Sequence, residues 1–344
     1  MSAITYDSVC CPDRSLEEVQ VEALIAQFDE AAQELQEVRN AIKGVIFGQD
    51  QVIEGSLTAV LAGGHALLVG VPGLAKTRLV ACLAAVLGLD NKRIQFTPDL
   101  MPSDIIGTEI LDSDHSGKRS LRYVKGPIFT QLLMADEINR ASPRTQSALL
   151  QAMQEYHITV AGESYHLPMP FHVLATQNPL EQEGTYSLPE AQLDRFLMQI
   201  NIDYPDLESE RQIITTISAK QETLATAILS PARLQSIQKM VRQMPISEEI
   251  IEAILRLVRA LRPGANNEHA QQHIAWGPGP RASQAFSLCA RARALYHGRL
   301  APSLDDICAL AVPILQHRMA LNFNARTDNL DTRTILLSTM KKTL

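Results

Sequence analysis

Residues 66–77 read ALLVGVPGLAKT: four apolar residues, a turn with two glycines, and a lysine–threonine pair. A short apolar run of this kind is typical of a buried parallel strand. The residues from Lys76 to Leu87 have the pattern of a helix. A strand that passes through a glycine-containing turn into a helix is the setting of a P-loop, in which backbone N–H groups and the helix N-terminus surround a phosphate. The stretch therefore predicts a phosphate-binding α/β core.

The residues of this predicted loop have separate roles. Lys76 is expected to reach the β- and γ-phosphates of a nucleoside triphosphate, and the Thr77 hydroxyl to bind Mg²⁺. Alanine stands at position 75, where the strict motif has glycine; it adds one methyl group and tolerates a right-handed conformation, so the loop is still predicted. The alternative is a chance Gly/Pro turn before a core helix. The predicted loop comprises Gly70, Val71, Pro72, Gly73, Leu74, Ala75, Lys76 and Thr77.

Further short apolar runs predict strands at residues 94–96, 131–135 and 172–175, with helical stretches between them, notably 142–156. Strands that alternate with helices imply a parallel sheet with right-handed crossovers. Two alternating segments, at about 108–129 and 156–172, interrupt this order and predict hairpin insertions.

The two ends of the chain have a different pattern from the core. Residues 16–43 predict one long amphipathic helix or a helix pair. Beyond residue 205 the strand signals vanish, and residues 207–337 are predicted to be helical. We therefore expect an N-terminal helical extension (1–40), an α/β core (41–205) and a helical lid domain (206–344).

Two carboxylates, Asp136 and Glu137, directly follow the strand predicted at residues 131–135. Asp136 follows a buried apolar run and suits a contact with Mg²⁺ or its waters, and Glu137 suits the orientation and deprotonation of an attacking water. An ordinary acidic cap at a strand–helix junction is the alternative. The order of the two motifs, with Lys76 upstream, favours the catalytic interpretation.

Three further polar residues are candidates for contacts with phosphate. Asn178 follows the strand at 172–175 and can donate and accept hydrogen bonds; a simple turn before Pro179 is its alternative. Arg195 could stabilise charge on the transferred phosphoryl group, or form a surface pair with Asp194. Arg281, at the start of a predicted helix, could reach a nucleotide held between the domains, or be a solvated side chain.

Composition excludes several classes of protein. The net charge is −7 and aromatic residues make up 5%, which argues against a surface that coats nucleic acid or binds single strands by stacking. The five cysteines form no CxxC pair, so free thiols in a reducing cytosol are expected. No signal peptide is visible, and the longest apolar stretch is too short for membrane insertion.

The motifs as a set resemble the MoxR group of AAA+ ATPases. They are GVPGLAKT (70–77), FTPDLMPSDIIG (96–107), ADEINRASPRTQSALLQAMQE (135–155), ATQNP (175–179), LPEAQLDRF (188–196) and GPRAS (279–283), in the family's order over about residues 41–320. The resemblance implies a three-layer αβα core with a helical lid, ATP and Mg²⁺ as ligands, and ATPase activity.

The resemblance also implies roles for single residues. It gives a Walker A motif at 70–77, a Walker B motif at Asp136 and Glu137, a first sensor at Asn178, an arginine finger at Arg195 and a second sensor at Arg281. Ile46 and Phe47 lie in the segment that packs on adenine in such proteins. Asn139 and Arg140 match a family extension whose role stays open, either a contact with a neighbouring subunit or structural support.

The expected assembly follows from Arg195, which has no obvious place in its own subunit's site. We expect a homo-oligomeric ring, a hexamer, in which Lys76 and Arg281 of one subunit and Arg195 of the next converge on one triphosphate. The hairpins would face a protein client or the pore, and a separate von Willebrand A-type protein is a possible partner. The alternatives are a chelatase- or activase-like motor subunit dedicated to one enzyme, and a P-loop phosphotransferase.

Overall fold

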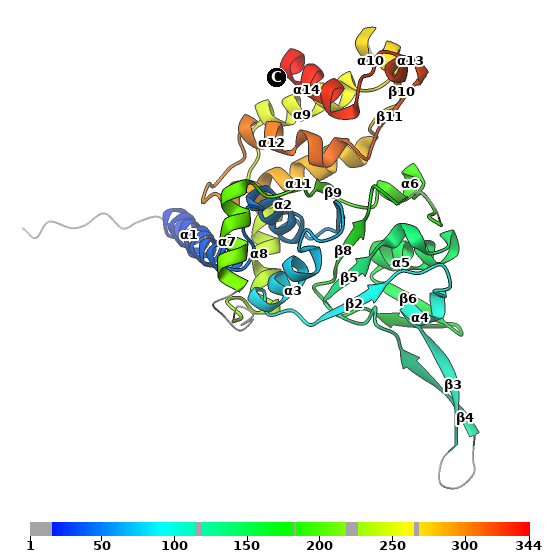
Figure 1. Cartoon of the computed structure of the whole chain (residues 1–344). Helices are drawn as coiled ribbons and strands as arrows, with labels where there is room; N and C mark the ends of the chain where they lie inside the picture. Colours follow the sequence, from blue (N-terminus) through cyan, green and yellow to red (C-terminus); the bar gives the residue numbers. More distant parts are fainter. Residues whose placement is uncertain (1–15, 114–118, 182–183, 218–225, 265–267) are drawn as a thin grey trace, which may run out of the picture.

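The computed structural model describes residues 16–113, 119–181, 184–217, 226–264 and 268–344 (Figure 1). Its centre is a five-stranded sheet of parallel strands in the order β2-β5-β8-β1-β9. Strands that are neighbours in this sheet are far apart in sequence, as crossover connections require. The predicted parallel α/β core is therefore confirmed. The strands are β1 (Ala66–Val69), β2 (Asn91–Gln95), β5 (Leu132–Asp136), β8 (His172–Gln177) and β9 (Met198–Asn201).

Helices precede, separate and follow these strands. One 3-10 turn, η1 (Ile138–Arg140), follows β5. The α-helices are α1 (Leu16–Lys43), α2 (Asp50–Leu61), α3 (Lys76–Val86), α4 (Pro102–Ile106), α5 (Pro143–Glu155), α6 (Glu190–Leu193), α7 (Leu207–Ile217), α8 (Pro231–Gln243), α9 (Glu248–Ala260), α10 (Glu268–His273), α11 (Pro280–Tyr296), α12 (Leu304–Leu315), α13 (Phe323–Thr327) and α14 (Thr332–Thr343). None of these helices, within the residues described, is long and apolar enough to cross a membrane.

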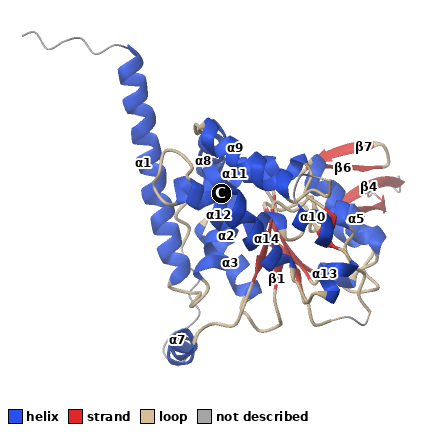
Figure 2. Cartoon of the chain, turned by 90° about the horizontal axis from the view of Figure 1, so that it is seen from above, coloured by secondary structure: helices blue, strands red, loops and turns tan. Residues whose placement is uncertain are grey.

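The sheet lies between two separate apolar clusters, because successive side chains of a strand point to opposite faces. In β1, Ala66 and Leu68 belong to a cluster with residues of α2, α3 and the lid helices, whereas Leu67 belongs to a cluster with residues of α5. β5 divides in the same way, with Met134 in the first cluster and Leu133 in the second. This gives the three-layer arrangement (Figure 2).

The two alternating segments form hairpins, as predicted. β3 (Gly107–Ser113) pairs with β4 (Arg119–Lys125), and β6 (His157–Val160) pairs with β7 (Glu163–His166), both antiparallel. The β3–β4 hairpin projects away from the rest of the chain (Figure 1). Leu111 and Leu121 lie opposite each other on it and are 60% and 66% exposed. The β3–β4 hairpin thus has a pair of solvent-exposed apolar side chains.

The C-terminal part differs from the expectation in one respect. It is mostly helical, but β10 (Ile274–Trp276) pairs with β11 (Ala320–Leu321), so the prediction of helix alone over 207–337 is wrong. The pair joins two segments more than forty residues apart. Each strand has two or three residues, too short to produce a visible period-2 pattern.

The N-terminal segment forms one helix, α1, rather than a helix pair. Its buried side chains, from Phe28 to Ile42, belong to the same apolar cluster as α2, α3 and the lid helices. Arg233 of α8 pairs with Glu34 and Glu30 of α1, with the Arg233 Nε to Glu34 Oε2 distance at 2.8 Å. The helix is therefore packed into the fold. Of the five cysteines, Cys82, Cys289 and Cys308 lie in the described part and are free, while Cys10 and Cys11 lie outside it.

Candidate functional site

The predicted loop between β1 and α3 needs its glycines for two different reasons. A Cβ on Gly70 would lie 2.8 Å from the Ile202 carbonyl oxygen, so the loop begins where two backbones come close together. The Gly70 N–H donates to the Gln177 carbonyl at 3.1 Å, which fixes the start of the loop to β8. Gly73 has φ +87°, a conformation that favours glycine, and open space where a Cβ would be. The loop is therefore fixed at Gly70, where it leaves β1, and has open space beside Gly73.

Ala75 has a left-handed backbone, with φ +55° and ψ +22°. The expectation that alanine is tolerated there as a right-handed residue is therefore wrong. Glycine suits the position better because an L-residue costs about 1–2 kcal/mol in this region. The loop keeps its conformation despite that cost, and strain of this kind is common next to functional groups.

The Lys76 ammonium lies inside the loop. Its Nζ donates to the Gly70 carbonyl at 2.6 Å. Partial burial lowers the pKa of Lys76, and the nearby carboxylates of Asp136, Glu137 and Glu181 oppose that shift. Thr77, the next residue, is exposed in the first turn of α3. A cation surrounded by carboxylates under a row of loop N–H groups can hold a polyphosphate chain.

Asp136 ends β5 and is almost fully buried. The guanidinium of Arg93, on the adjacent edge strand β2, donates to its Oδ2 from Nη2 at 2.6 Å and from Nε at 3.1 Å. The Thr176 hydroxyl on β8 donates to the other oxygen, Oδ1. Both carboxylate oxygens of Asp136 therefore have protein partners from the two strands that flank β5.

Glu137 also has a left-handed backbone, with φ +55°. Its N–H donates to the Thr176 hydroxyl at 2.9 Å, which anchors the turn after β5. Its Oε2 accepts hydrogen bonds from Gln95 Nε2 at 2.7 Å and from Arg140 Nη1 at 2.9 Å. The carboxylate of Glu137 is thus held by Gln95 and Arg140. Both contacts leave it beside the loop that carries Lys76.

Asn178 directly follows β8 and is buried. Its Oδ1 accepts from the Leu180 N–H at 3.1 Å, so the side chain caps its own turn. This is the local role given as the alternative for an asparagine before proline. Its position at the carboxyl end of β8, between β1 and β5, still places it beside the loop.

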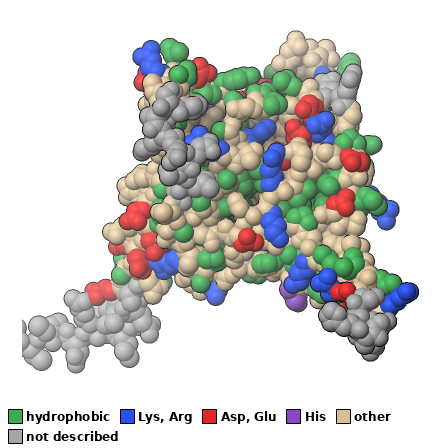
Figure 3. All heavy atoms as spheres, turned by 60° about the horizontal axis from the view of Figure 1, so that its bottom comes forward, with side chains coloured by type: hydrophobic (Ala, Val, Ile, Leu, Met, Phe, Trp, Pro, Cys, Tyr) green, Lys and Arg blue, Asp and Glu red, His purple; other side chains and the backbone are tan. Residues whose placement is uncertain are grey.

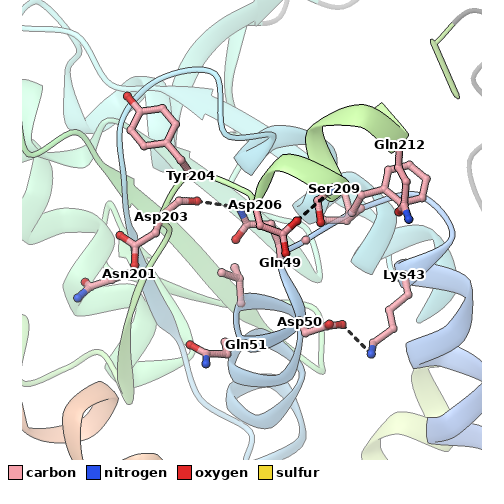
Figure 4. Close-up of a pocket in the computed structure, with 14 residues that line it drawn as sticks. Lys43, Gln49, Asp50, Gln51, Asn201, Asp203, Tyr204, Asp206, Ser209 and Gln212 are labelled. Atoms are coloured by element: carbon pink, nitrogen blue, oxygen red, sulfur yellow. Dashed lines mark hydrogen bonds and ion pairs between the residues drawn. The ribbon is translucent and has the colours of Figure 1, made fainter. Parts of the chain in front are cut away.

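A cavity of about 500 Å³ lies next to the loop, between the end of α1, the start of α2 and α7 (Figure 4). Ile46, Phe47, Tyr204 and Gln212 are among the residues that line it. Gln49 donates to the Asp203 carbonyl at 2.9 Å across it. Ile202 lies between Asn201 and Asp203, which both line the cavity, and its carbonyl oxygen lies close to Gly70. A flat, partly apolar group could therefore occupy this cavity next to the loop.

Arg195 and Arg281 lie at the other end of the sheet. Both line a cavity with Gly64 and His65, which directly precede β1, whereas Lys76 follows the loop at the carboxyl end of β1. Gly64 and Gly70 are six positions apart on either side of β1, which in extended chain is about 20 Å. The expectation that Arg281 converges with Lys76 in one chain is wrong. The reason is that α11 begins beside Asp194, whose Oδ2 lies 3.5 Å from Arg281 Nη1.

The donor set near the loop suits a hard cation. Thr77 and Asp136 offer oxygen atoms, the ligands that Mg²⁺ prefers. No group of three or more His, Cys, Asp or Glu side chains that could hold a metal was found within the described residues. A metal there would therefore depend on ligands from a bound phosphate or water.

Arg93 and Gln95 had no signal in the sequence motifs, and Thr176, which lies in the ATQNP motif, had no predicted role. They contact Asp136 and Glu137 from neighbouring strands, about 40 positions away in sequence. A pattern read along one segment cannot detect such contacts. The signal that could have found them is the polar character of β2, whose arginine and glutamine alternate toward one face.

Two family models match the chain. The model described as "ATPase family associated with various cellular activities (AAA)" matches residues 65–198, and the AAA lid domain matches residues 266–337. The first range contains the loop, the Asp136–Glu137 pair and Arg195, and the second contains Arg281.

Several proteins are similar over most of their length. Chaperone MoxR1 of Mycobacterium tuberculosis is 41% identical over 86% of this chain and 78% of its own. Protein MoxR of Paracoccus denitrificans is 31% identical over 82% of this chain and 87% of its own. A crystal structure from Cytophaga hutchinsonii, of a protein assigned as an ATPase, has a TM-score of 0.86 and 39% identity, and the match covers 96% of this chain and 99% of that one.

Proposed function

Because the chain belongs to the MoxR family of AAA+ ATPases, we propose that it hydrolyses ATP to ADP and phosphate in order to remodel a protein client. The observation that carries the proposal is the position of Lys76, held under an open glycine turn with Asp136 and Glu137 beside it. These three groups are the ones that an ATPase needs to bind the phosphates and activate water.

ATP binds along the loop with its base in the cavity lined by Ile46 and Phe47. The backbone N–H groups of Gly73, Leu74 and Ala75 hold the β-phosphate, and the dipole of the 11-residue helix α3 adds to the attraction. Lys76 exchanges its hydrogen bond with the Gly70 carbonyl for the β- and γ-phosphates. The apolar side of the cavity is partly buried, which suits stacking of adenine.

Mg²⁺, which would be held by the Thr77 hydroxyl and the Asp136 carboxylate, supplies positive charge at the phosphates. The fit is supported by oxygen donors on both residues. Oδ2 of Asp136 already accepts two hydrogen bonds from Arg93, so Arg93 would compete with the cation for that oxygen, whereas Oδ1 accepts one hydrogen bond and keeps a lone pair.

Glu137 acts as the general base. Its carboxylate orients a water for attack on the γ-phosphate and takes a proton from it. Gln95 and Arg140 hold Oε2, so Oε1 is the oxygen left for the water. Asn178 contributes its amide N–H to the same region, since its carbonyl oxygen is used by the turn.

Arg195 and Arg281 act on the nucleotide of a neighbouring subunit in a homo-oligomeric ring, which we take to be a hexamer. Neither guanidinium can reach Lys76 in its own chain, because they lie beside Gly64, at the opposite end of β1. A closed ring with one repeated head-to-tail interface can bring the amino edge of each sheet to the carboxyl edge of the next. Both arginines would then stabilise charge on the transferred phosphoryl group.

The β3–β4 hairpin is the segment that contacts the client. Its exposed Leu111–Leu121 pair and the exposed Ile110 and Val124 offer apolar contacts away from the nucleotide. A von Willebrand A-type protein is the proposed partner that selects clients, and the cytoplasm is the proposed compartment. On the face drawn in Figure 3, basic side chains are interspersed with acidic and apolar ones. The proposal therefore includes no nucleic-acid partner.

The experiment is a steady-state ATPase assay of Glu137→Gln. We expect turnover to fall at least 100-fold, since general-base catalysis contributes about 10²–10⁴-fold, while ATP binding stays near that of the unmodified chain. Glu252→Gln, on the exposed face of α9, is the matched control. Full turnover by Glu137→Gln would contradict the proposal. Release of phosphate without any added acceptor separates the ATPase from a phosphotransferase.

A further inference from the structure

The cavity between the lid and the amino end of the sheet contains an unusual concentration of positive charge. It has a volume of about 340 Å³, and four arginines line it: Arg195, Arg242, Arg281 and Arg318. They come from four different parts of the chain: the loop before β9, the end of α8, the start of α11, and the turn that follows α12. Asp194 is the only carboxylate among the described residues that line it.

One of the four arginines is fully used by the fold. Arg318 is buried; its Nε donates to Asp194 Oδ1 at 2.7 Å, and its Nη atoms donate to the carbonyls of Ile314, Phe196 and Leu197. The other oxygen of Asp194 faces Arg281 at 3.5 Å. The single carboxylate is therefore shared by two guanidinium groups. Two more cations, Arg195 and Arg242, form no ion pair with a carboxylate in the described chain.

Arg242 is held in this place by the helix that carries it. Gln238, one turn earlier on α8, is buried; its amide donates to the Val60 carbonyl at 2.8 Å and lies 3.0 Å from His172 Nε2. The guanidinium of Arg242 lies over Gly63, where its Nη2 would be 3.0 Å from an added Cβ. Gly63 has φ +78° and no side chain, which leaves room for the arginine.

We propose that Arg242 is a third arginine that contacts the triphosphate of the neighbouring subunit, together with Arg195 and Arg281. This rests on the proposed ring, and goes beyond it by assigning a phosphate contact to α8. The guanidinium groups of Arg195, Arg242 and Arg281 line one small cavity. In the proposed ring, this cavity would face the nucleotide of the neighbouring subunit. Each planar group can hold two phosphate oxygens, which suits a compact polyanion.

The N-terminal turn of α11 supports a phosphate over an acidic peptide. This helix has 17 residues, and its first two turns bring Arg281 and Gln284 to the cavity. The positive dipole end of this helix at one side of the cavity favours concentrated negative charge. An acidic client segment is the competing ligand, and the experiment below separates the two.

The experiment mixes inactive subunits. Lys76→Ala cannot hold phosphates but keeps its arginines; Arg242→Gln and Arg195→Ala keep their loops but lack one arginine each. Arg256→Gln, at an exposed position on α9, is the matched control. ATP turnover, KM and kcat are measured for each variant alone and for equimolar mixtures with Lys76→Ala, with assembly checked by light scattering.

We expect Arg242→Gln to lower kcat/KM by about 10- to 100-fold, the value of a hydrogen bond to a charged group, with Arg242→Lys in between. An equimolar mixture of Arg242→Gln with Lys76→Ala should turn over ATP faster than the sum of the two variants measured alone. Under random mixing, about one site in four combines an intact Lys76 from one subunit with an intact Arg242 from the next. Arg195→Ala should recover in the same way, and Arg256→Gln should match the unmodified protein.

The outcomes separate the two proposals. If Arg195→Ala recovers in the mixture but Arg242→Gln behaves like Arg256→Gln, the ring stands and the role of Arg242 is overturned. The role is also overturned if Arg242→Gln is impaired without recovery, or if it changes only the stimulation of turnover by a client. If Arg195→Ala itself fails to recover while assembled, the proposed action between subunits is wrong.

Discussion

Three buried histidines should make the stability of this chain fall steeply below neutral pH. Burial lowers the pKa of His65 and of His317 to about 3 and that of His172 to about 4, from 6.5. His65 Nδ1 accepts from the Val173 N–H at 3.0 Å, so its proton is on Nε2, which lies 3.0 Å from the Met153 carbonyl. A second proton on any of these rings would have no acceptor.

The direction of the pH dependence of stability follows from the lowered pKa values. Below pH 6.5 the unfolded chain binds protons at these three positions, and the folded chain does not until about pH 4, so the free energy of unfolding decreases as the pH falls. Between pH 7 and pH 5 each histidine contributes a loss of about 2 kcal/mol, and the three together about 6 kcal/mol. This window lies above the titration of carboxylates.

The assay is urea unfolding followed by circular dichroism at several pH values between 7 and 5. His317→Gln keeps a donor toward the Phe196 carbonyl, which His317 Nε2 faces at 3.1 Å, and should reduce the loss to about 4 kcal/mol. A partly exposed histidine, replaced by glutamine as in His157→Gln, is the control and should leave the slope unchanged. A loss below about 2 kcal/mol in the unmodified chain would refute the reasoning.

Three further substitutions test other contacts. Arg93→Gln frees one oxygen of Asp136, and should lower the Mg²⁺ concentration for half-maximal ATP hydrolysis by about 3- to 10-fold; an unchanged Mg²⁺ titration would count against the contact. Ala75→Gly relieves a left-handed alanine and should raise the free energy of unfolding by about 1 kcal/mol in urea; a decrease would contradict the assigned backbone. Arg318→Met removes the main partner of Asp194 and the donor to the carbonyls of Ile314, Phe196 and Leu197, and should lower the melting temperature, at a cost of about 3 kcal/mol; an unaltered melting curve would be inconsistent with those contacts.

The central sheet could be predicted where its strands are buried on both faces. β1, β5 and β8 have continuous apolar runs, because parallel strands in the middle of a sheet contact helices on both sides. β2 lies at the edge, and its exposed polar residues hid its start, so the predicted 94–96 became Asn91–Gln95. β9, the other edge strand, reads MQIN and produced no predicted strand.

The candidate site was predictable to the extent that its residues lie in continuous motifs. Lys76, Asp136 and Glu137 come together because parallel strands end at the same edge of the sheet, a rule that needs no coordinates. The position of Arg281 could not be predicted in this way. It depends on how α11 packs against α2, α8 and α9, which no local pattern specifies.

The four residues of β1 connect two places that would serve different nucleotides. At one end is the loop with Lys76, and at the other are Gly64 and the arginine cavity. An extended strand is already near its maximum length, so it can be displaced but cannot stretch. In a ring, β1 would act as a rigid rod, and any axial movement of the loop on ATP binding would reach the arginines offered to the next subunit. The binding of ATP at one site and the placement of the arginines offered to the next site would then be linked through a single strand.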